Sequence, residues 1–490
     1  MNAAIVIIFG FLLLSLVLGI RARQGHTMDM EQWAIGGRGF SKFLVFILLA
    51  GETYSVFTLL GTSGFAYANG PAAFYTVAFT TLGMITSYWL LPPVWRYAKK
   101  HQIISMSELF SKKYKSAGLG IFVTVIGVVA LIPYIVVLFK SMGILVSATS
   151  YGSISPQVAI WIGMIVLVVY VLVSGIHGSA WNAIIKDILI FFVILFLGIY
   201  LPFKYYGGIQ SMFEAVHLAK PNFMMFPESG KSMSWFLSTI AISTFGYFMW
   251  PHNAPVIFSA KNERAFRFNA VVFPLYALMV LFVCLVGYTA AIQIPGLKGG
   301  DTDFALLNLS MKSFDPWFVG IIGATGLLAT LIPGSMMLIS ASTMLTKNFF
   351  FSVFPNVNES KTPMVAKVFV IVLSMICTLF ALLESSTLVT LYLTAYAMVI
   401  QLAPSLYFSF TKNNPITKQG AFAGITLGIG FILYTSFAKV TMITLFPTMP
   451  KIVQDLNIGV LALVINIVTM CLVSVLTKKT ANISTDQSVA

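Results

Sequence analysis

Long apolar stretches separated by short polar segments run through the whole chain. A membrane-spanning helix needs about 20 mostly apolar residues, and thirteen stretches approach or exceed this length. In chain order, these predicted spans 1 to 13 cover residues 3–20, 43–68, 74–94, 119–148, 158–175, 180–203, 235–258, 269–294, 317–346, 368–383, 388–410, 421–437 and 458–476. The pattern predicts an all-α polytopic membrane protein with about thirteen transmembrane helices.

Two of these spans carry polar and helix-breaking residues at mid-membrane depth. Span 2 contains Gly51 and Glu52 followed by hydroxyl side chains, and span 7 contains Trp250-Pro251. Pro251 removes a backbone donor and crowds the preceding turn, and unwound backbone in a membrane is tolerated only around a cavity or inside protein. Both spans are therefore predicted to be broken helices.

The two predicted breaks begin five spans apart, and an odd number inverts the second unit relative to the first. This spacing favours an inverted five-helix repeat, an arrangement known from transporters. The predicted organisation is an extra N-terminal helix with an inner loop (1–42), a first repeat (43–203), a second repeat (204–410), and two extra helices with a short cytoplasmic tail (411–490).

Composition and charge agree with a membrane protein. Of 490 residues 58% are hydrophobic and 9% are charged, whereas soluble domains carry about 25% charged residues. The net charge of +14 could indicate a nucleic-acid partner, but most of the 29 lysines and arginines fall in alternate connections between spans. The positive-inside rule then predicts an N-terminus outside and a C-terminus in the cytoplasm. The expected partner is the lipid bilayer of the plasma membrane. We expect no nucleic acid, no cofactor, no obligate protein partner and no metal site beyond a possible Na⁺ site.

Several local motifs then resemble the sodium:solute symporter family. They are Gly36-Gly37-Arg38 before span 2, Gly61 to Tyr67 at its end, Pro133-Tyr134 in span 4, Gly175 to Lys186-Asp187 opening span 6, and Ala260-Lys261-Asn262 after span 7. The resemblance runs from about residue 33 to 410 and is nearest to a less-studied, bacterial branch related to monocarboxylate and small-solute permeases. It implies a LeuT-like fold, a substrate site between the two breaks, and a coupling-ion site made of span 2 carbonyls and a pair of hydroxyls in span 9.

The sequence departs from the family pattern at the implied ion site. Where the hydroxyl pair is expected in span 9, this chain has Ile332-Pro333, although a small shift in alignment would bring in Thr330 or Ser335. Lys186 also stands where the family often has threonine. The resemblance to a sodium site is therefore incomplete.

Lys186 is the most informative of these departures. We hypothesise that its ammonium lies near the carbonyls of Gly51 and Tyr54 and replaces sodium, so that the carrier couples to protons or runs as a uniporter; the alternative is a lysine that snorkels to the cytoplasmic surface. Asp187 matches an acid of the family's inner path. Consecutive helical side chains point about 100° apart, so no simple pair between Lys186 and Asp187 is expected.

Other candidate site residues cluster at the two breaks. Glu52 could bond free backbone donors, receive a substrate amine or relay a proton. His252 could line the inner cavity or be structural, and Lys140 could attract anions or reach the interface. The remaining predicted substrate-site residues are Thr53, Ser55, Phe57, Tyr247 and Trp250.

These features favour a secondary active symporter that imports a small organic solute, a monocarboxylate or an amino acid, by alternating access coupled to H⁺ or Na⁺. A solute sensor with a transporter fold that signals through a separate partner is the alternative. A membrane enzyme is disfavoured because the sequence shows no nucleophile–base set and no cluster of metal ligands.

Overall fold

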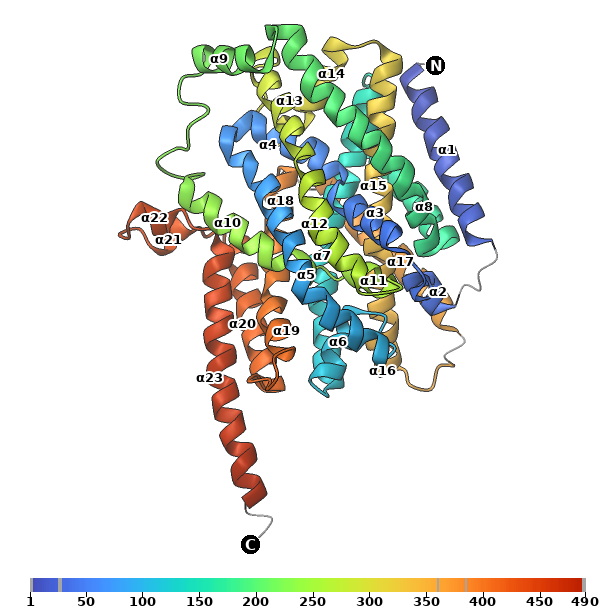
Figure 1. Cartoon of the computed structure of the whole chain (residues 1–490), viewed down its shortest axis with the longest axis vertical. Helices are drawn as coiled ribbons and strands as arrows, with labels where there is room; N and C mark the ends of the chain where they lie inside the picture. Colours follow the sequence, from blue (N-terminus) through green and yellow to red (C-terminus); the bar gives the residue numbers. More distant parts are fainter. Residues whose placement is uncertain (1–2, 25–28, 359–360, 384–385, 487–490) are drawn as a thin grey trace.

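The computed structural model describes residues 3–24, 29–358, 361–383 and 386–486, which form helices and the segments that connect them (Figure 1). The N-terminal half contains α1 (Ala3–Arg23), α2 (Met30–Ile35), α3 (Lys42–Thr53), α4 (Thr62–Asn69), α5 (Tyr75–Lys100), α6 (Met106–Lys113), α7 (Ala117–Thr149), α8 (Pro156–Tyr206) and α9 (Ile209–Ala219). The C-terminal half contains α10 (Met233–Gly246), α11 (Asn253–Ser259), α12 (Arg264–Ala277), α13 (Met279–Gln293), α14 (Ala305–Ser313), α15 (Pro316–Met344), α16 (Phe351–Val353), α17 (Thr362–Leu383), α18 (Leu388–Val399), α19 (Ala403–Ser409), α20 (Lys418–Phe437), α21 (Met442–Leu445), α22 (Lys451–Gln454) and α23 (Ile458–Asp486).

Ten helices of the described residues are long and apolar enough to cross a membrane. Two of them contain two predicted spans each: the stretch Phe57–Lys100 turns after α4, and α8 turns at Gly175. The broken span that starts with α10 is too short to be counted with them. Once these turns are taken into account, the helices correspond to the thirteen predicted crossings.

The turn inside α8 depends on a single glycine. Its 51 residues would extend about 76 Å as one helix, far more than the roughly 30 Å of a bilayer's hydrocarbon core. Gly175 adopts φ 55° and ψ −156°, and a Cβ there would lie 2.7 Å from Cδ1 of Trp33. Only glycine fits this conformation and this close approach, so Gly175 separates spans 5 and 6.

The two broken spans lie against each other at the ends of α3 and α11. Phe40, just before α3, donates its N–H to the Ser259 carbonyl at 2.9 Å, and its own carbonyl accepts from Lys261 N at 2.9 Å. These two bonds form an isolated parallel bridge between segments more than 200 residues apart in the chain. The bridge fixes the half-helices α3 and α11 relative to each other, as the predicted inverted repeat requires.

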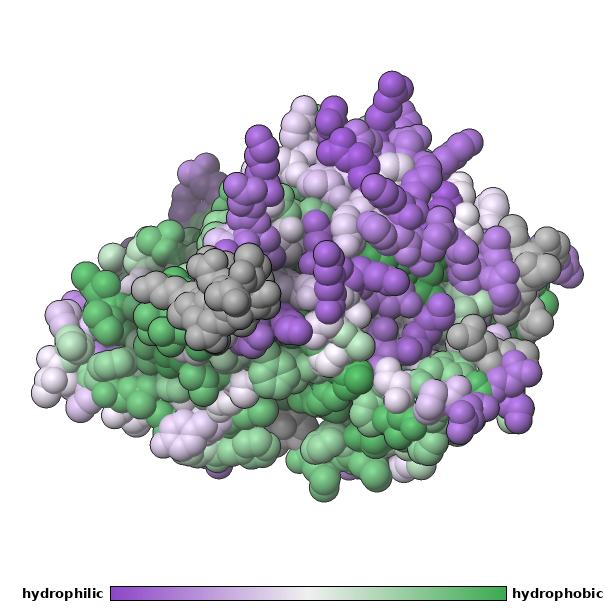
Figure 2. All heavy atoms as spheres, turned by 90° about the horizontal axis from the view of Figure 1, so that it is seen from below, coloured by the Kyte–Doolittle hydropathy of each residue, from purple (hydrophilic) through white to green (hydrophobic). Residues whose placement is uncertain are grey.

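Flanking helices and connections complete the bundle. α1 packs against α8 and α15, and α20 packs against α23 at the other edge. Between spans 3 and 4 lies α6, whose N-cap Ser105 accepts from Glu108 N. Hydrophilic side chains gather over part of the end of the molecule that is seen from below (Figure 2), and α6 lies at that end (Figure 1). The N-terminal helix starts at the opposite end from the C-terminus, as an odd number of crossings requires.

Candidate functional site at the two helix breaks

Both predicted helix breaks are present. α3 ends at Thr53, Tyr54 leaves the helical region with φ −86° and ψ 62°, and a π-helical turn resumes at Phe57. In the second broken span, Trp250 is extended with φ −62° and ψ 124°. A residue that precedes proline is pushed out of the helical region, so Pro251 explains the second break.

Side chains from the same spans and from α15 satisfy carbonyls that these breaks release. Thr58 Oγ1 donates to the Thr53 carbonyl at 2.7 Å. In the second break, Asn253 Nδ2 donates to the Tyr247 carbonyl at 2.8 Å, and Ser340 Oγ of α15 donates to the Pro251 carbonyl at 2.8 Å. Free carbonyls at this depth would each cost several kcal/mol in hydrocarbon, so these contacts hold the breaks open as fixed polar structure.

Lys186 satisfies the remaining carbonyls of the first break. Its Nζ donates to the carbonyl oxygens of Gly51 at 3.0 Å and Tyr54 at 2.9 Å, the two atoms that the sequence hypothesis named. The side chain is 0% exposed, which rules out snorkelling to the surface in this structure. The ammonium therefore occupies a position among break carbonyls that a metal cation could otherwise take.

The prediction that Lys186 and Asp187 form no local pair is wrong. Lys186 Nζ lies 2.6 Å from Oδ1 of Asp187, which is also buried. Although the two side chains leave the helix in different directions, the four methylenes of lysine let its ammonium reach back. An ammonium has three donors, and Lys186 has three oxygens around it. Low dielectric makes such a buried pair strongly favourable compared with either charge alone.

The alternative ligands in span 9 are engaged elsewhere. Thr330 Oγ1 donates to the Gly326 carbonyl of its own helix at 2.9 Å, and Ser335 Oγ lies 2.7 Å from Ser179 Oγ. The residue of α15 that faces Gly51 is Ile332, whose Cγ2 lies 3.6 Å from the position of a Cβ built on Gly51. The side of the first break that faces α15 is therefore apolar at this point.

Glu52 of the first break pairs with His252 of the second. The distance from Oε1 to Nε2 is 2.8 Å, and both side chains are buried. The other ring nitrogen of His252, Nδ1, is buried and has no hydrogen-bond partner among the described residues. Sequence reasoning considered the two residues separately; no local signal connects positions 200 residues apart.

Aromatic side chains lie around the Glu52–His252 pair. Three of them were not among the site residues predicted from the sequence. The Trp250 ring lies 5.1 Å from the rings of both Tyr134 and Tyr396, and Phe57 stacks on Tyr392 at 4.0 Å between centroids. Tyr392 and Tyr396 are four residues apart and share one face of α18, a spacing that could have pointed to them. Tyr134 was noted only as part of a motif.

Hydroxyls complete the lining of the central cavity. Ser55 Oγ lies 3.4 Å from the Tyr134 hydroxyl, and Thr53 Oγ1 contacts the Tyr247 hydroxyl. The cavity lined by Glu52 and its neighbours has a volume of about 10 Å³, roughly one water molecule. Its other lining residues include Thr53, Phe57, Thr58, Tyr247 and Tyr392. The cavity between the two breaks is therefore closed around the volume of about one water molecule in this structure.

Lys140, the second embedded lysine, lies near the start of span 11. Its Nζ donates to the Ser386 carbonyl. Its charge also acts on Asp303, which precedes α14. Lys140 is thus tied to the loop before α18 and lies apart from the Glu52–His252 pair.

Comparison with known proteins identifies the family of the chain. A sequence model of the Sodium:solute symporter family matches residues 33–428. The chain belongs to the sodium:solute symporter family. This confirms the resemblance that the local motifs indicated.

The relatives are transporters from bacteria. A protein described as the uncharacterized symporter YhjB of Bacillus subtilis is 52% identical over 488 residues, which is 100% of both chains. A monocarboxylate transport permease protein of Rhizobium johnstonii is 26% identical over 438 residues, 88% of this chain and 87% of its own. The outward-open, substrate-bound structure of a Na⁺-coupled sialic acid symporter superimposes with a TM-score of 0.79 at 16% identity, over 97% and 98% of the two chains. The structural match confirms the all-helical transporter fold, and the chain is a multi-pass membrane symporter for a small solute.

Proposed function

We propose that this chain imports a small monocarboxylate together with a proton, by alternating access, across the plasma membrane of a bacterium. The N-terminus lies outside and the C-terminus in the cytoplasm, as the distribution of lysine and arginine indicates. The observation that carries the proposal is the placement of Lys186 on the carbonyls of Gly51 and Tyr54. The monocarboxylate permease among the relatives supports the substrate class.

Lys186 takes the role of a fixed cation. Sodium would need several oxygens around it, but the Gly51 and Tyr54 carbonyls already accept from Nζ, and Asp187 neutralises the ammonium. Ile332 presents a hydrocarbon side chain where the family pattern expects a hydroxyl. A sodium ion at this position would have to displace a buried lysine, so transport without sodium is expected.

The Glu52–His252 pair supplies the proton site. A buried pair with one proton between the carboxylate and the imidazole carries a net charge of −1 when the imidazole is neutral. A monoanion entering beside it would be repelled strongly in this low dielectric. One additional proton, shared by the two groups, makes the pair neutral and removes the repulsion. Anion and proton therefore enter together, as an electroneutral symporter requires.

The same pair favours a monocarboxylate over an amino acid. An amino acid needs a carboxylate free to receive its ammonium group, but Glu52 Oε1 is already 2.8 Å from His252 Nε2. A solute carboxylate needs donors. The Tyr134 ring lies 5.9 Å from the His252 ring, and the Tyr392 ring lies 4.9 Å from the rings of both Tyr134 and Tyr396. The proposal accordingly assigns the tyrosines, with Thr53 and Ser55, to the solute carboxylate.

Uptake by purified protein in sealed proteoliposomes tests this proposal. Labelled lactate, pyruvate, alanine and proline are supplied with an inward proton gradient, with an inward sodium gradient, or with neither, and empty liposomes give the passive leak. We expect monocarboxylate uptake that a proton gradient drives in sodium-free buffer. Lys186→Gln abolishes it, while Lys204→Gln, at the exposed end of the same helix, does not.

Other outcomes overturn specific parts of the proposal. Strict dependence on sodium refutes the role of Lys186 and returns Thr330 or Ser335 to consideration. Uptake of amino acids alone refutes the substrate assignment. Binding of a monocarboxylate without flux in any gradient favours the sensor over the symporter.

A further inference from the structure

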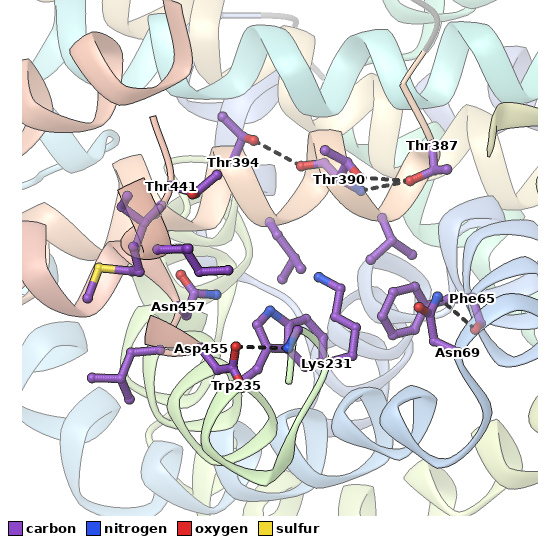
Figure 3. A pocket seen from close by; sticks show the side chains of 18 of the residues that line it. Phe65, Asn69, Lys231, Trp235, Thr387, Thr390, Thr394, Thr441, Asp455 and Asn457 are labelled. Carbon is purple, nitrogen blue, oxygen red and sulfur yellow. Dashed lines mark hydrogen bonds between the residues drawn. The ribbon is translucent and has the colours of Figure 1, made fainter. Parts of the chain in front are cut away.

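A second and much larger cavity lies away from the two helix breaks. Its volume is about 640 Å³, and it opens between the starts of α10, α18 and α23 and the ends of α4 and α20 (Figure 3). Its walls combine apolar and hydrogen-bonding side chains, including Phe65, Asn69, Lys231, Trp235, Thr390, Leu393, Thr394, Ile432, Asp455 and Asn457. On the proposed orientation these helix ends face the outside of the cell.

Lys231 brings a positive charge into this cavity without a carboxylate partner. No ion pair within 4.0 Å among the described residues includes Lys231. Its Nζ instead lies over the Trp235 ring at 4.1 Å and near the Phe65 ring at 5.8 Å. Figure 3 shows its side chain directed into the cavity, toward the wall formed by Thr390.

Each of the two acidic residues that line the cavity already accepts a hydrogen bond from a backbone N–H group. Asp303 Oδ2 accepts from Leu388 N at 3.0 Å, and Asp455 Oδ1 accepts from Gly230 N at 2.8 Å. The second carboxylate oxygen of Asp455 is buried and has no hydrogen-bond partner among the described residues. Among the described residues that line the cavity, Lys231 is therefore a cation that no carboxylate neutralises.

Two further features set the electrostatics around Lys231. Burial lowers the pKa of Lys231 to about 8, because its ammonium has lost much of its hydration. α10 begins two residues later and its N-cap residue Ser232 makes no side-chain cap, so the positive end of the helix dipole adds to the field near Lys231. An anion placed here would replace part of the hydration that the Lys231 ammonium lost on burial.

We propose that this cavity is a second binding site, outside the central one, for a carboxylate that carries an apolar body. The carboxylate pairs with Lys231, and the body lies against Trp235, Phe65 and Leu393. The site holds solute before it passes Phe57 and Tyr392 into the central cavity, so its role, though not its binding chemistry, rests on the proposed function. Ligands too large for the central site still fit this one.

Dansylglycine is a suitable probe because it is a carboxylate with a naphthalene body. Its size excludes it from a central cavity of about 10 Å³ but not from the larger one. Binding to the purified full chain in detergent is followed by energy transfer from tryptophan to the dansyl group. Dansylamide, which lacks the carboxylate, is the uncharged comparison.

We expect saturable binding of dansylglycine at one site per chain and weak binding of dansylamide. Lys231→Gln should weaken dansylglycine binding about tenfold or more, as the loss of a charge-assisted hydrogen bond does. Lys231→Arg should restore most of the affinity. Lys451→Gln, which changes an exposed lysine paired with Glu228, should leave it unchanged. Each variant is first compared with the parent protein by its melting temperature.

The proposal is overturned if the parent protein does not bind dansylglycine, if dansylamide binds equally well, or if Lys231→Gln has no effect in a folded protein. This result is separable from the transport test. Dansylglycine binding through Lys231 without monocarboxylate uptake refutes the proposed function and leaves the second site. Monocarboxylate uptake without dansylglycine binding refutes the second site and leaves the proposed function.

Discussion

The buried contact between Lys186 and Asp187 allows a quantitative test of the site. Lys186→Met keeps an unbranched, mostly apolar side chain one atom shorter than lysine but removes the ammonium that bonds the carbonyls of Gly51 and Tyr54 and neutralises Asp187. Removing one partner of a buried ion pair costs about 3–5 kcal/mol, and the carbonyls left without donors add about 1 kcal/mol or more each. We expect Lys186→Met to lower the free energy of unfolding by about 5–7 kcal/mol, the sum of these terms.

Neutralising the partner should restore part of that loss. In the double variant Lys186→Met/Asp187→Asn no charge is left buried, and only the two carbonyls lack their donors. The double variant should therefore be more stable than Lys186→Met alone by about 2–3 kcal/mol, the scale of a direct coupling between contacting residues.

Unfolding in mixed micelles of dodecyl maltoside and sodium dodecyl sulfate, followed by circular dichroism, measures both differences. Lys204→Met, at the exposed end of the same helix, is the control and should change the free energy by no more than about 0.5 kcal/mol. A double variant that is as unstable as the two single changes added together would refute the reasoning, because it would show that the two charges do not stabilise each other.

Two further predictions concern proton coupling and the outer cavity. Glu52→Gln keeps an acceptor for His252 but removes the acidic group, so counterflow exchange of labelled monocarboxylate should persist while proton-driven accumulation in proteoliposomes is lost; accumulation at the parent level would contradict the proton site. In the outer cavity, Lys231 has its pKa lowered to about 8 by burial, and burial raises the pKa of Asp303 to about 7. As pH rises, Lys231 loses its positive charge and Asp303, in the lining of the same cavity, gains a negative one. Dansylglycine should therefore bind most tightly near pH 6 and progressively more weakly toward about pH 9; an affinity that is constant over this range would contradict the assignment.

The positions of the helices and of both breaks could be predicted because local chemistry controls them. The thickness of hydrocarbon sets the length of each apolar stretch, and Pro251 cannot continue the hydrogen-bonding pattern of a helix. Gly175 ends span 5 in the prediction and turns the chain in the structure. The contact of Lys186 with Gly51 and Tyr54 could also be predicted, because a buried ammonium needs oxygen acceptors and a broken helix leaves carbonyl oxygens free to accept.

Contacts between distant segments could not be predicted in this way. The Glu52–His252 pair joins the two repeats, and Tyr392 and Tyr396 reach it from span 11. Nothing in the residues around His252 indicates that Glu52 is its neighbour. The pair of Lys186 with Asp187 was excluded from average helix geometry, but burial made the favourable rotamers those that bring the charges together.

The sequence by itself thus determined the solvent of this protein, its crossings, its two helix breaks and its family, because each depends on residues that are close in the chain or on a pattern repeated along it. The tertiary structure alone decided which charges meet, how little room the central site has, and that an unpaired lysine lies in a large second cavity. Those properties depend on side chains from α3, α8, α10, α11, α18 and α23, which only packing of the complete bundle brings together.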